Sequence, residues 1–417
     1  MKNLNEITRD LGVRPCDILI PQDKQTFEKW SVIACDQYTS QPEYWENVSR
    51  FTSGTPSTLD IIFPEVYLED GEPDERILNI NRKMEEYLKS DIFQTIKDSF
   101  ILVDRSFPGE KSRKGLVMAF DLDKYDYAPH ASSLIRATEG TVLDRIPPRV
   151  RIRANAPLEV PHIMILIDDP GKTVIEPLFN KNLPDVYDFE LMQLSGHIKG
   201  YAVSEEDDIL QVLYALKKLC NGDDPLLFAV GDGNHSLASA KVHWESIKKD
   251  ITPQEALTHP ARYALAELVN LHDDGLVFES INRICFNTDP QEFLKEFKEY
   301  FSKKSETGII QKFKFSYAGL SGEIDIPNCE HTLEIGTLQE FLDYKSSNSD
   351  IKIDYIHGED IVHELSAKPN SIGFLLPAMN KNDLFKSIAA SGVLPRKTFS
   401  MGESFEKRFY FECRKII

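Results

Sequence analysis

From Leu226 to Trp244 the chain reads LLFAVGDGNHSLASAKVHW, and this stretch predicts a strand, a polar turn and a helix. Residues 226–230 are all apolar and follow the turn-forming run 221–225, which is typical of a short buried strand. From Ser236 onward apolar residues recur at helical spacing, and either Ser236 or Asn234 can cap the helix. The glycine-containing turn therefore joins the end of a strand to the start of a helix.

This turn carries residues that we expect to bind phosphate and to transfer protons. A helix N-terminus directs backbone N–H groups and the positive end of the helix dipole toward one spot, which favours an anion. The predicted phosphate ligands are Gly231, Gly233, Asn234 and Ser236, and the predicted catalytic groups are Asp232 and His235. The alternative is a tight connection that needs glycine for its backbone conformation alone. The spacing matches neither G-x-x-x-x-G-K-[ST] nor G-x-G-x-x-G, so neither a P-loop nor a Rossmann site is indicated.

The composition indicates a globular protein without a membrane span. The chain has 417 residues, of which 41% are hydrophobic and 28% charged, and this length suits two or three domains. No apolar run approaches the length of a membrane helix, and the first residues lack the apolar core of a signal peptide. The six cysteines form no C-x-x-C pair and no cluster, so we expect reduced thiols, no zinc site and a cytoplasmic location.

The formal net charge of −19 narrows the expected partners. Such a field repels duplex nucleic acid and anionic membranes on average, so we expect neither as a partner. A small-molecule phosphate ligand would then need a local basic pocket. Assembly into a homo-oligomer is left open.

Two segments concentrate basic residues. The first segment, 135–153, is predicted to contain a strand over 149–153 that presents its arginines on one face, where they match phosphate or carboxylate oxygens. Its arginines are Arg136, Arg145, Arg149, Arg151 and Arg153. The alternative is a solvated face paired with acids. Glu139 precedes this strand and is a candidate base beside the bound phosphate.

The second basic segment, 394–410, combines Arg396, Lys397, Lys407 and Arg408 with two hydroxyls and a glycine. Such a loop suits an anion lid, with Arg396 and Lys397 as phosphate ligands, or else a hairpin with exposed charges. Asp36 follows the apolar run 29–35, which predicts a strand, and side chains at strand ends often belong to sites. We therefore include Asp36 among the catalytic candidates, whereas Cys35 is expected to lie in the core.

The pattern along the chain predicts an α+β or mixed α/β fold, with the strand-turn-helix site in a central mixed sheet and further α/β regions at both ends. A long amphipathic helix is expected over 72–99, and further helices over 205–220 and 236–250. The regions expected are an N-terminal one at 1–130, a central one at 131–290 that holds the turn, and a C-terminal one at 291–417.

Several of these segments resemble those of the bacterial and archaeal domain-of-unknown-function family 1015. The resemblance extends over nearly the full length and rests on six separated segments in the same order. They are Lys29–Thr39, Pro56–Leu59, Ile135–Thr141, Gly231–His235, Tyr355–Gly358 and Leu394–Gly402.

The family's central D-G-x-H-R motif is in turn similar to a motif of the ParB, sulfiredoxin and free-serine-kinase superfamily. That resemblance implies that the segment opens a helix and holds nucleotide phosphates. In this chain Ser236 stands where the motif has arginine, so one of the basic segments must supply the missing positive charge.

These observations lead to one functional hypothesis and two alternatives. The leading hypothesis is a nucleotide- or phosphometabolite-binding enzyme, a phosphotransferase or phosphohydrolase acting on a small molecule, with Mg²⁺ and ATP or ADP as candidate cofactors. Arg136, Arg149 and Arg151 would neutralise the developing charge, and Asp36, Glu139 or His235 would orient or deprotonate the acceptor. The alternatives are a non-catalytic nucleotide sensor and a protein that binds a metabolite other than a nucleotide.

Overall fold

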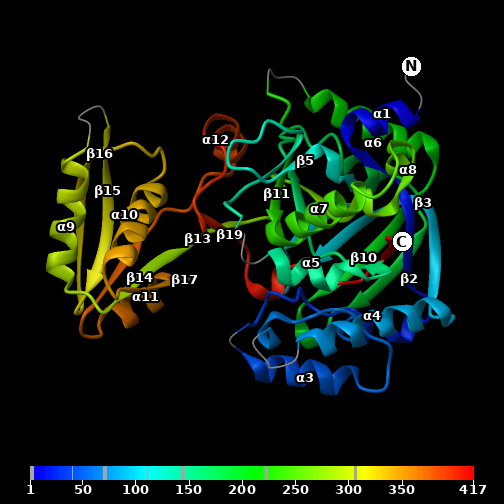
Figure 1. Cartoon of the computed structure of the whole chain (residues 1–417), viewed down its shortest axis with the longest axis horizontal. Helices are drawn as coiled ribbons and strands as arrows, with labels where there is room; N and C mark the ends of the chain where they lie inside the picture. The colour runs from blue at the N-terminus through cyan, green and yellow to red at the C-terminus, as the bar shows by residue number, and fades with distance from the viewer. Residues whose placement is uncertain are drawn as a thin grey trace. The chain divides into compact units, whose positions relative to one another are not determined.

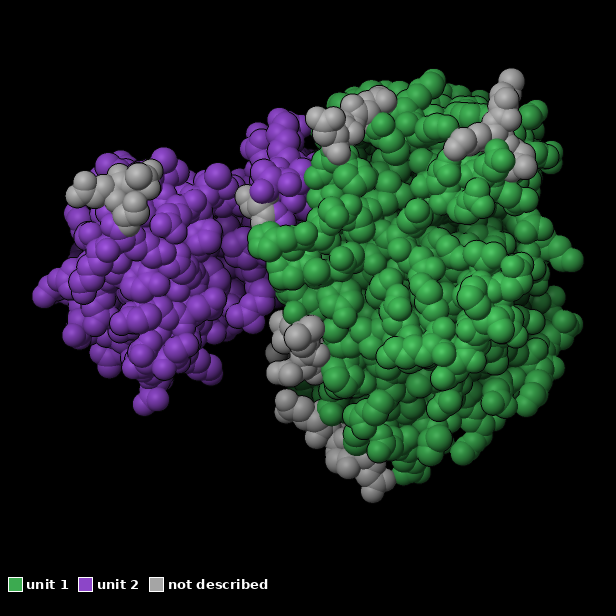
Figure 2. All heavy atoms as spheres, turned by 45° about the horizontal axis from the view of Figure 1, so that its top comes forward, with its two compact units in different colours: residues 1–277, 402–417 green, residues 278–401 purple. Residues whose placement is uncertain are grey.

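The computed structural model describes residues 4–39, 41–68, 73–109, 111–141, 146–220, 224–304 and 308–417. The chain divides into two compact units, which Figure 2 shows in different colours. Unit 1 comprises Met1–Val277 and Gly402–Ile417, and unit 2 comprises Phe278–Met401. Unit 2 is thus an insertion in the sequence of unit 1, and the chain returns to unit 1 for its last residues.

This division differs from the three regions expected at 1–130, 131–290 and 291–417. Strand β4 (Ser112–Asp121) pairs along its length with β12 (Tyr263–Asn270), so a strand of the first region and a strand of the second share one sheet. Residues of the last region also pair with the beginning of the chain, because Leu19 and Cys413 form a β-bridge. Strand pairing between distant segments overrides the sequential division.

Unit 1 is built on one mixed sheet, which confirms the predicted fold class. Its strand order is β5-β6-β11-β8-β12-β4-β3-β10-β9, with β1 on β4 and β2 on β3. Strand β11 runs parallel to β6 and antiparallel to β8. The remaining strands are β1 (Val13–Arg14), β2 (Cys16–Pro21), β3 (Phe93–Ser106), β5 (Tyr125–Asp126), β6 (Ile135–Ala137), β8 (Met164–Ile167), β9 (Asp185–Glu190), β10 (His197–Val203) and β11 (Phe228–Asp232).

Helices cover both faces of this sheet, because its central strands are apolar on both sides. In β4, Leu116, Met118 and Phe120 face one core, and Val117 and Ala119 face the other. The first core lies under α1 (Leu4–Leu11), α6 (Glu206–Leu219), α7 (Asn234–Lys248) and α8 (Pro253–Thr258). The second lies under α2 (Phe27–Trp30), α3 (Pro42–Thr52) and α4 (Pro73–Lys89). In Figure 1, α1, α6 and α8 lie on one side of the sheet and α3 and α4 on the other.

Unit 2 contains an antiparallel sheet of order β16-β15-β18-β14-β17. Its core is rich in phenylalanine, and α9 contributes Phe293, Phe297 and Phe301 at four-residue spacing. Its elements are β13 (Phe278–Ser280), β14 (Asn282–Phe286), α9 (Pro290–Ser302), β15 (Ile309–Tyr317), β16 (Leu320–Cys329), α10 (Glu334–Asn348), β17 (Lys352–Ile356), α11 (Glu359–Ser366), β18 (Ser371–Leu375), α12 (Leu384–Ser391) and β19 (Phe399–Met401).

Three expected elements are wrong. The helix expected over 72–99 ends at Lys89, and β3 then pairs with β2 from Phe93 onward. The strand expected over 149–153 is helix α5 (Ile146–Ala154), in which two prolines occupy the first turn, where no intrahelical N–H is needed. The strand expected over 29–35 is the end of α2 followed by an extended segment with one bridge, from Ile33 to Phe409.

Within the described residues, no helix is long and apolar enough to cross a membrane.

Candidate functional site

The predicted strand, turn and helix are confirmed as β11, a turn and α7. The register of β11 against β8 shifts between Val230 and Asp232, so Gly231 lies at a bulge. Gly233 is the N-cap of α7 and has a φ of 78°, in the left-handed region. A Cβ at this position would lie 3.0 Å from Ile163 Cγ1. Both the backbone and Ile163 therefore require glycine at 233, independently of any ligand.

The first residue of α7 ties the helix to the neighbouring strand. The Asn234 side chain is buried, and its amide oxygen accepts the Thr138 N–H at 3.3 Å. Its amide nitrogen donates to Thr138 Oγ1 and to the Val230 carbonyl, each at 3.3 Å. Because these bonds use the side chain, Asn234 can contact a ligand at this turn only through its backbone. The side chain instead fixes where α7 begins.

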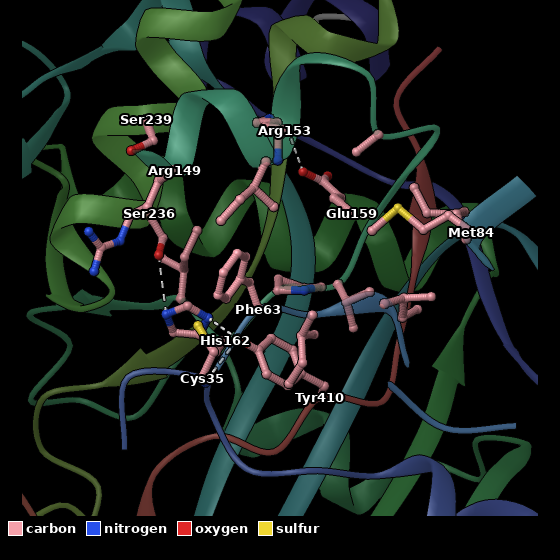
Figure 3. A pocket seen from close by; sticks show the side chains of 18 of the residues that line it. Cys35, Phe63, Met84, Arg149, Arg153, Glu159, His162, Ser236, Ser239 and Tyr410 are labelled. Carbon is pink, nitrogen blue, oxygen red and sulfur yellow. Dashed lines mark hydrogen bonds and ion pairs between the residues drawn. The ribbon is translucent and has the colours of Figure 1, made fainter. Parts of the chain in front are cut away.

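The imidazole of His162 lies at the centre of a polar group that we call the His162 cluster, formed by Asp36, His162, Ser236 and Tyr410. His162 Nε2 is 3.2 Å from Ser236 Oγ and 3.9 Å from Asp36 Oδ2. On the other side of the ring, Nδ1 is 2.8 Å from Tyr410 Oη. Figure 3 shows His162 between Ser236 and Tyr410. Nε2 therefore has the Ser236 hydroxyl within hydrogen-bond distance and the Asp36 carboxylate beyond it, and Nδ1 has the Tyr410 hydroxyl.

The charges around the cluster determine its protonation. Burial raises the pKa of Asp36, but nearby His162, a hydrogen bond from Gln37 and Lys407 outweigh it, so the net pKa is lowered. Burial raises the pKa of Tyr410, so the phenol keeps its proton. Burial and the acids Asp36 and Glu65 raise the pKa of the Cys35 thiol. Asp36 is thus a carboxylate at neutral pH, and Cys35 is a protonated thiol that is partly buried at the edge of the core.

The last segment of the chain, residues 402–417, brings a lysine to the turn. Lys407 is 9% exposed, and its Nζ lies 3.9 Å from Asp232 Oδ2. Lys407 also lowers the pKa of Asp36 through its charge. The segment is held by backbone hydrogen bonds, because Ala34 N–H donates to the Arg408 carbonyl and Tyr410 N–H to the Val32 carbonyl. A positive charge therefore stands beside Asp232, at the turn that leads into α7.

Beneath the His162 cluster the same segment forms a buried network of charges. Arg408 Nε donates to Glu267 Oε2 and Arg408 Nη2 to Glu412 Oε2, both at 2.8 Å. Arg408 Nη1 donates to the Pro161 carbonyl at 2.9 Å. Because His162 follows Pro161 directly, this bond helps to fix the position of the imidazole.

A cavity of about 150 Å³ opens beside the His162 cluster. His162, Ser236 and Arg149 line it together with side chains from α4 and α5. Arg149 forms an ion pair with Glu65, and Arg153 Nη2 lies 2.6 Å from Glu159 Oε2. Burial raises the pKa of Glu65, and Arg149 offsets part of that rise. The cavity thus has a polar end at the turn and internally paired charges on its wall.

The described residues were also searched for metal sites. Within them, no group of three or more His, Cys, Asp and Glu side chains is arranged to hold a metal ion. The carboxylates of Asp36 and Asp232 lie near the turn, 3.9 Å from His162 Nε2 and from Lys407 Nζ respectively.

The sequence was compared with models of known families. The model described as "Protein of unknown function (DUF1015)" matches residues 13–378. The chain belongs to the DUF1015 family. This match confirms the resemblance predicted from the sequence, and it includes five of the six segments that carried it. No curated protein matches this DUF1015 chain.

Solved structures provide a second comparison for the DUF1015 chain. Free serine kinase in complex with AMP is 13% identical, with a TM-score of 0.40, and the match covers 73% of this chain and 94% of that one. A conserved hypothetical protein from Pyrococcus furiosus is 12% identical, with a TM-score of 0.38 and coverage of 72% and 95%. C-terminally truncated SbnI from Staphylococcus aureus is 8% identical, with a TM-score of 0.36 and coverage of 69% and 82%.

The structure brings some of the predicted site residues together and separates others. Asp36, Asp232 and Ser236 meet at the turn, and Arg149 lines the adjoining cavity. His235 is partly buried on the first turn of α7. Glu139 follows β6, whose parallel pairing with β11 brings both strand ends to the same edge of the sheet.

The other basic residues lie elsewhere. Arg136 is buried in an ion pair with Asp224, so its charge is already compensated. Arg151 is exposed, and its Nη1 lies 3.0 Å from Asp74 Oδ1. Arg396 and Lys397 belong to unit 2, and their backbone carbonyls accept hydrogen bonds from Arg283. Arg145 lies outside the described residues.

Three residues of the site were not among the predicted ones: His162, Tyr410 and Lys407. His162 lies near the start of the apolar run Pro161–Ile167, whereas Asp36 follows such a run, so the signal used for Asp36 does not identify His162. Lys407 was noted only as part of a basic segment. Nothing near Tyr410 in the sequence indicates its partner, because 248 residues separate it from His162.

Proposed function

We propose that this chain is a nucleotide- or phosphometabolite-binding enzyme, a phosphotransferase or phosphohydrolase that acts on a small molecule at the start of α7. One observation carries the proposal: Lys407, Asp36, His162 and Ser236 converge on the N-terminus of a fifteen-residue helix. A positive charge, an ionised carboxylate, an imidazole and a hydroxyl in one place are the groups that phosphoryl transfer needs.

The first turn of α7 is the proposed phosphate site. The backbone N–H groups at a helix start have no intrahelical partners, and the helix dipole adds a positive potential there. The amides of Asn234 and Ser236 belong to this turn, and Lys407 adds a full charge beside it. In a chain with a net charge of −19, this local concentration of positive potential supports an anionic ligand at this point.

The His162 cluster is the proposed proton-transfer site. In a serine-hydrolase triad, serine and acid occupy opposite nitrogens of the histidine. Here Ser236 and Asp36 share Nε2, so nucleophilic attack by Ser236 is not favoured. In the proposed step, the acceptor oxygen attacks phosphorus while the bond from phosphorus to the leaving oxygen breaks. The acceptor proton passes to the Asp36 carboxylate, and the leaving group departs with the electron pair.

The finer assignments follow from this arrangement. ATP or ADP is the proposed donor, and Mg²⁺ is proposed to enter with the nucleotide, near the carboxylates of Asp36 and Asp232. Glu139 and His235 remain candidates for orienting the acceptor. Arg149 is proposed to neutralise charge at the phosphate site, which requires that it exchange its partner Glu65 for the phosphate.

Ligand binding tests the proposal. We expect ATP, ADP or a phosphorylated metabolite to raise the melting temperature of the chain, because a ligand that binds only the folded state stabilises it. Lys407→Ala should weaken the binding of that ligand, measured by calorimetry, by about tenfold or more, since a charge-assisted contact contributes about 1.5–3 kcal/mol. Lys415→Ala, an exposed position on the same segment, is the matched control and should bind normally.

Two outcomes would contradict the proposal. The first is a screen of nucleotides and phosphorylated metabolites in which none raises the melting temperature. The second is a ligand that binds Lys407→Ala as tightly as the wild-type chain. Binding without any turnover of the nucleotide would instead favour a non-catalytic nucleotide sensor.

A further inference from the structure

The cavity beside the His162 cluster has a polar end and an apolar body. Figure 3 shows Ser236 and His162 close together at one end, and Met84 of α4 at a distance from them. Phe63, Ile152 and Leu265 are among the apolar side chains that line the cavity. The shape therefore suits a ligand with one polar group and a compact apolar remainder.

The charges on the cavity wall are compensated by one another. Arg149 is paired with Glu65, and Arg153 with Glu159. Glu159 also forms an ion pair with Arg414, whose Nη2 lies 2.6 Å from Glu159 Oε1. A charged group that entered the cavity would have to leave water and to compete for partners that are already engaged, which is unfavourable. The walls consequently favour a neutral occupant.

The volume sets the size of that occupant. An engineered apolar cavity of about 150 Å³ stays dry and binds benzene, and the cavity here has the same volume, about 150 Å³. A single six-membered ring or a branched aliphatic group of similar size fills such a space. Two fused rings or a sugar phosphate exceed it.

We infer that this cavity binds the acceptor of the reaction, and that the acceptor is a neutral alcohol with a benzene-sized apolar body. This inference rests on the proposed function. With the body among Phe63, Ile152 and Met84, the hydroxyl is directed to the polar end, where His162 and Ser236 lie. The proposed phosphate site at the start of α7 adjoins the same end, because Ser236 belongs to both.

Benzyl alcohol is the probe, and Ala156→Leu is the variant that fills the cavity. Ala156 lines the cavity and is buried, so three added carbons take space from the ligand. Ala154→Leu, an exposed position at the end of α5 and two residues before Ala156, is the matched control. In NMR titration we expect benzyl alcohol to bind the wild-type chain and Ala154→Leu alike, and Ala156→Leu about tenfold or more weakly.

Two further measurements sharpen the test. Benzoate has the same ring with a negative charge, and we expect it to bind at least about tenfold more weakly than benzyl alcohol. Met84→Ala enlarges the far end of the cavity, so naphthalenemethanol should gain affinity there relative to benzyl alcohol. This variant keeps the inference testable if Ala156→Leu does not fold.

The inference is overturned if benzyl alcohol binds Ala156→Leu as tightly as the wild-type chain, or if benzoate binds as well as the alcohol. It is also overturned if Met84→Ala leaves the preference between the two alcohols unchanged. These titrations contain no nucleotide, so failure of the proposed function is detected separately. If benzyl alcohol binds the cavity while no phosphorylated ligand binds at α7, the cavity is a binding site for a neutral alcohol, but the alcohol is not the acceptor of a phosphoryl group.

Discussion

The two units of the chain differ in what they bury. Within the described residues, every buried acidic side chain lies in unit 1, and the core of unit 2 is dominated by phenylalanine. The ion pairs of unit 2 lie nearer the surface, as Lys304 with Glu340 illustrates at 24% and 27% side-chain exposure. By contrast, Arg408 and Glu267 are paired at 4% and 3% exposure. Unit 2 shows that this chain can build a core without buried acids.

This difference indicates that the buried ion pairs of unit 1 have a role other than stabilising the fold. Burying an ion pair costs solvation free energy, and apolar replacements are often as stable or more so. In unit 1 the buried network lies under the His162 cluster, and Arg408 holds the Pro161 carbonyl. We therefore interpret the network as a support that fixes the candidate site.

The largest expected effect is on unit 1 when its network is broken. Arg408→Ala leaves Glu267 and Glu412 as buried charges without their arginine, which should destabilise unit 1 by about 3–5 kcal/mol. Phe297→Ala is the counterpart in unit 2 and should cost about 3–5 kcal/mol there through a cavity. Hydrogen exchange should show faster exchange in β8 and β12 for the first variant, and in β15 and β18 for the second.

The proposed role of the network in unit 1 is contradicted if hydrogen exchange in β8 and β12 of Arg408→Ala stays at the wild-type rate. A sharper version replaces Arg408, Glu267 and Glu412 together by Met, Leu and Leu. If the network serves the site, this variant should regain stability and still lose ligand binding. Full ligand binding in a stable triple variant would show that the network supports only the fold.

A fall in pH is expected to have an intermediate effect on the free energy of unfolding of unit 1. Burial lowers the pKa of His243 on α7 from 6.5 to about 4. The unfolded chain therefore binds the proton more readily, and unit 1 should lose stability as the pH falls from 6.5 toward 4, by roughly 1.4 kcal/mol for each pH unit. The described part of unit 2 buries no histidine, so it should lack this dependence. Denaturant titrations of the wild-type chain and of His243→Gln at pH 7 and pH 5 measure the difference.

The substitution His243→Gln should flatten the pH dependence of unit 1 in this window. An equally steep loss of stability in His243→Gln would assign the effect to other groups. Carboxylates whose pKa is lowered in the folded chain, such as Asp36 and Glu159, change stability at lower pH than His243 does.

The smallest effect is expected from Arg151. Its ion pair with Asp74 is exposed on both sides, at 55% and 78%, and such pairs contribute little. Arg151→Ala should change the free energy of unfolding by less than about 0.5 kcal/mol and leave ligand affinity unchanged. A loss of ligand affinity in Arg151→Ala, measured beside Lys407→Ala, would show that Arg151 of the first basic segment contributes to phosphate binding.

The parts of the site that depend on local sequence could be predicted. The apolar run 226–230, the glycines and the helical spacing after Ser236 all act over a few residues, so the strand, turn and helix follow directly from them. The same holds for the role of Ser236, whose substitution for arginine implied a positive charge from elsewhere. Lys407, from the second basic segment, lies 3.9 Å from Asp232 at the turn and is proposed to supply that charge.

The remaining parts depend on contacts between distant segments. His162 and Tyr410 meet only because residues 402–417 return to unit 1, and no local pattern encodes that return. The alternating arginines at 149–153 are equally compatible with a strand and with an exposed helix, because a five-residue run is too short to fix the period. The folded context decides, since α5 packs against α7.

The order of the segments along the chain also has a consequence for synthesis. Lys407 and Tyr410 follow the whole of unit 2, so a ribosome adds them only after the strands of the unit 1 sheet and all of unit 2 have been synthesised. Until then Asp36, His162 and Ser236 are present without the lysine and the tyrosine that complete their surroundings. A nascent or prematurely terminated chain should therefore have an incomplete site, and its unit 1 would lack the arginine that compensates Glu267.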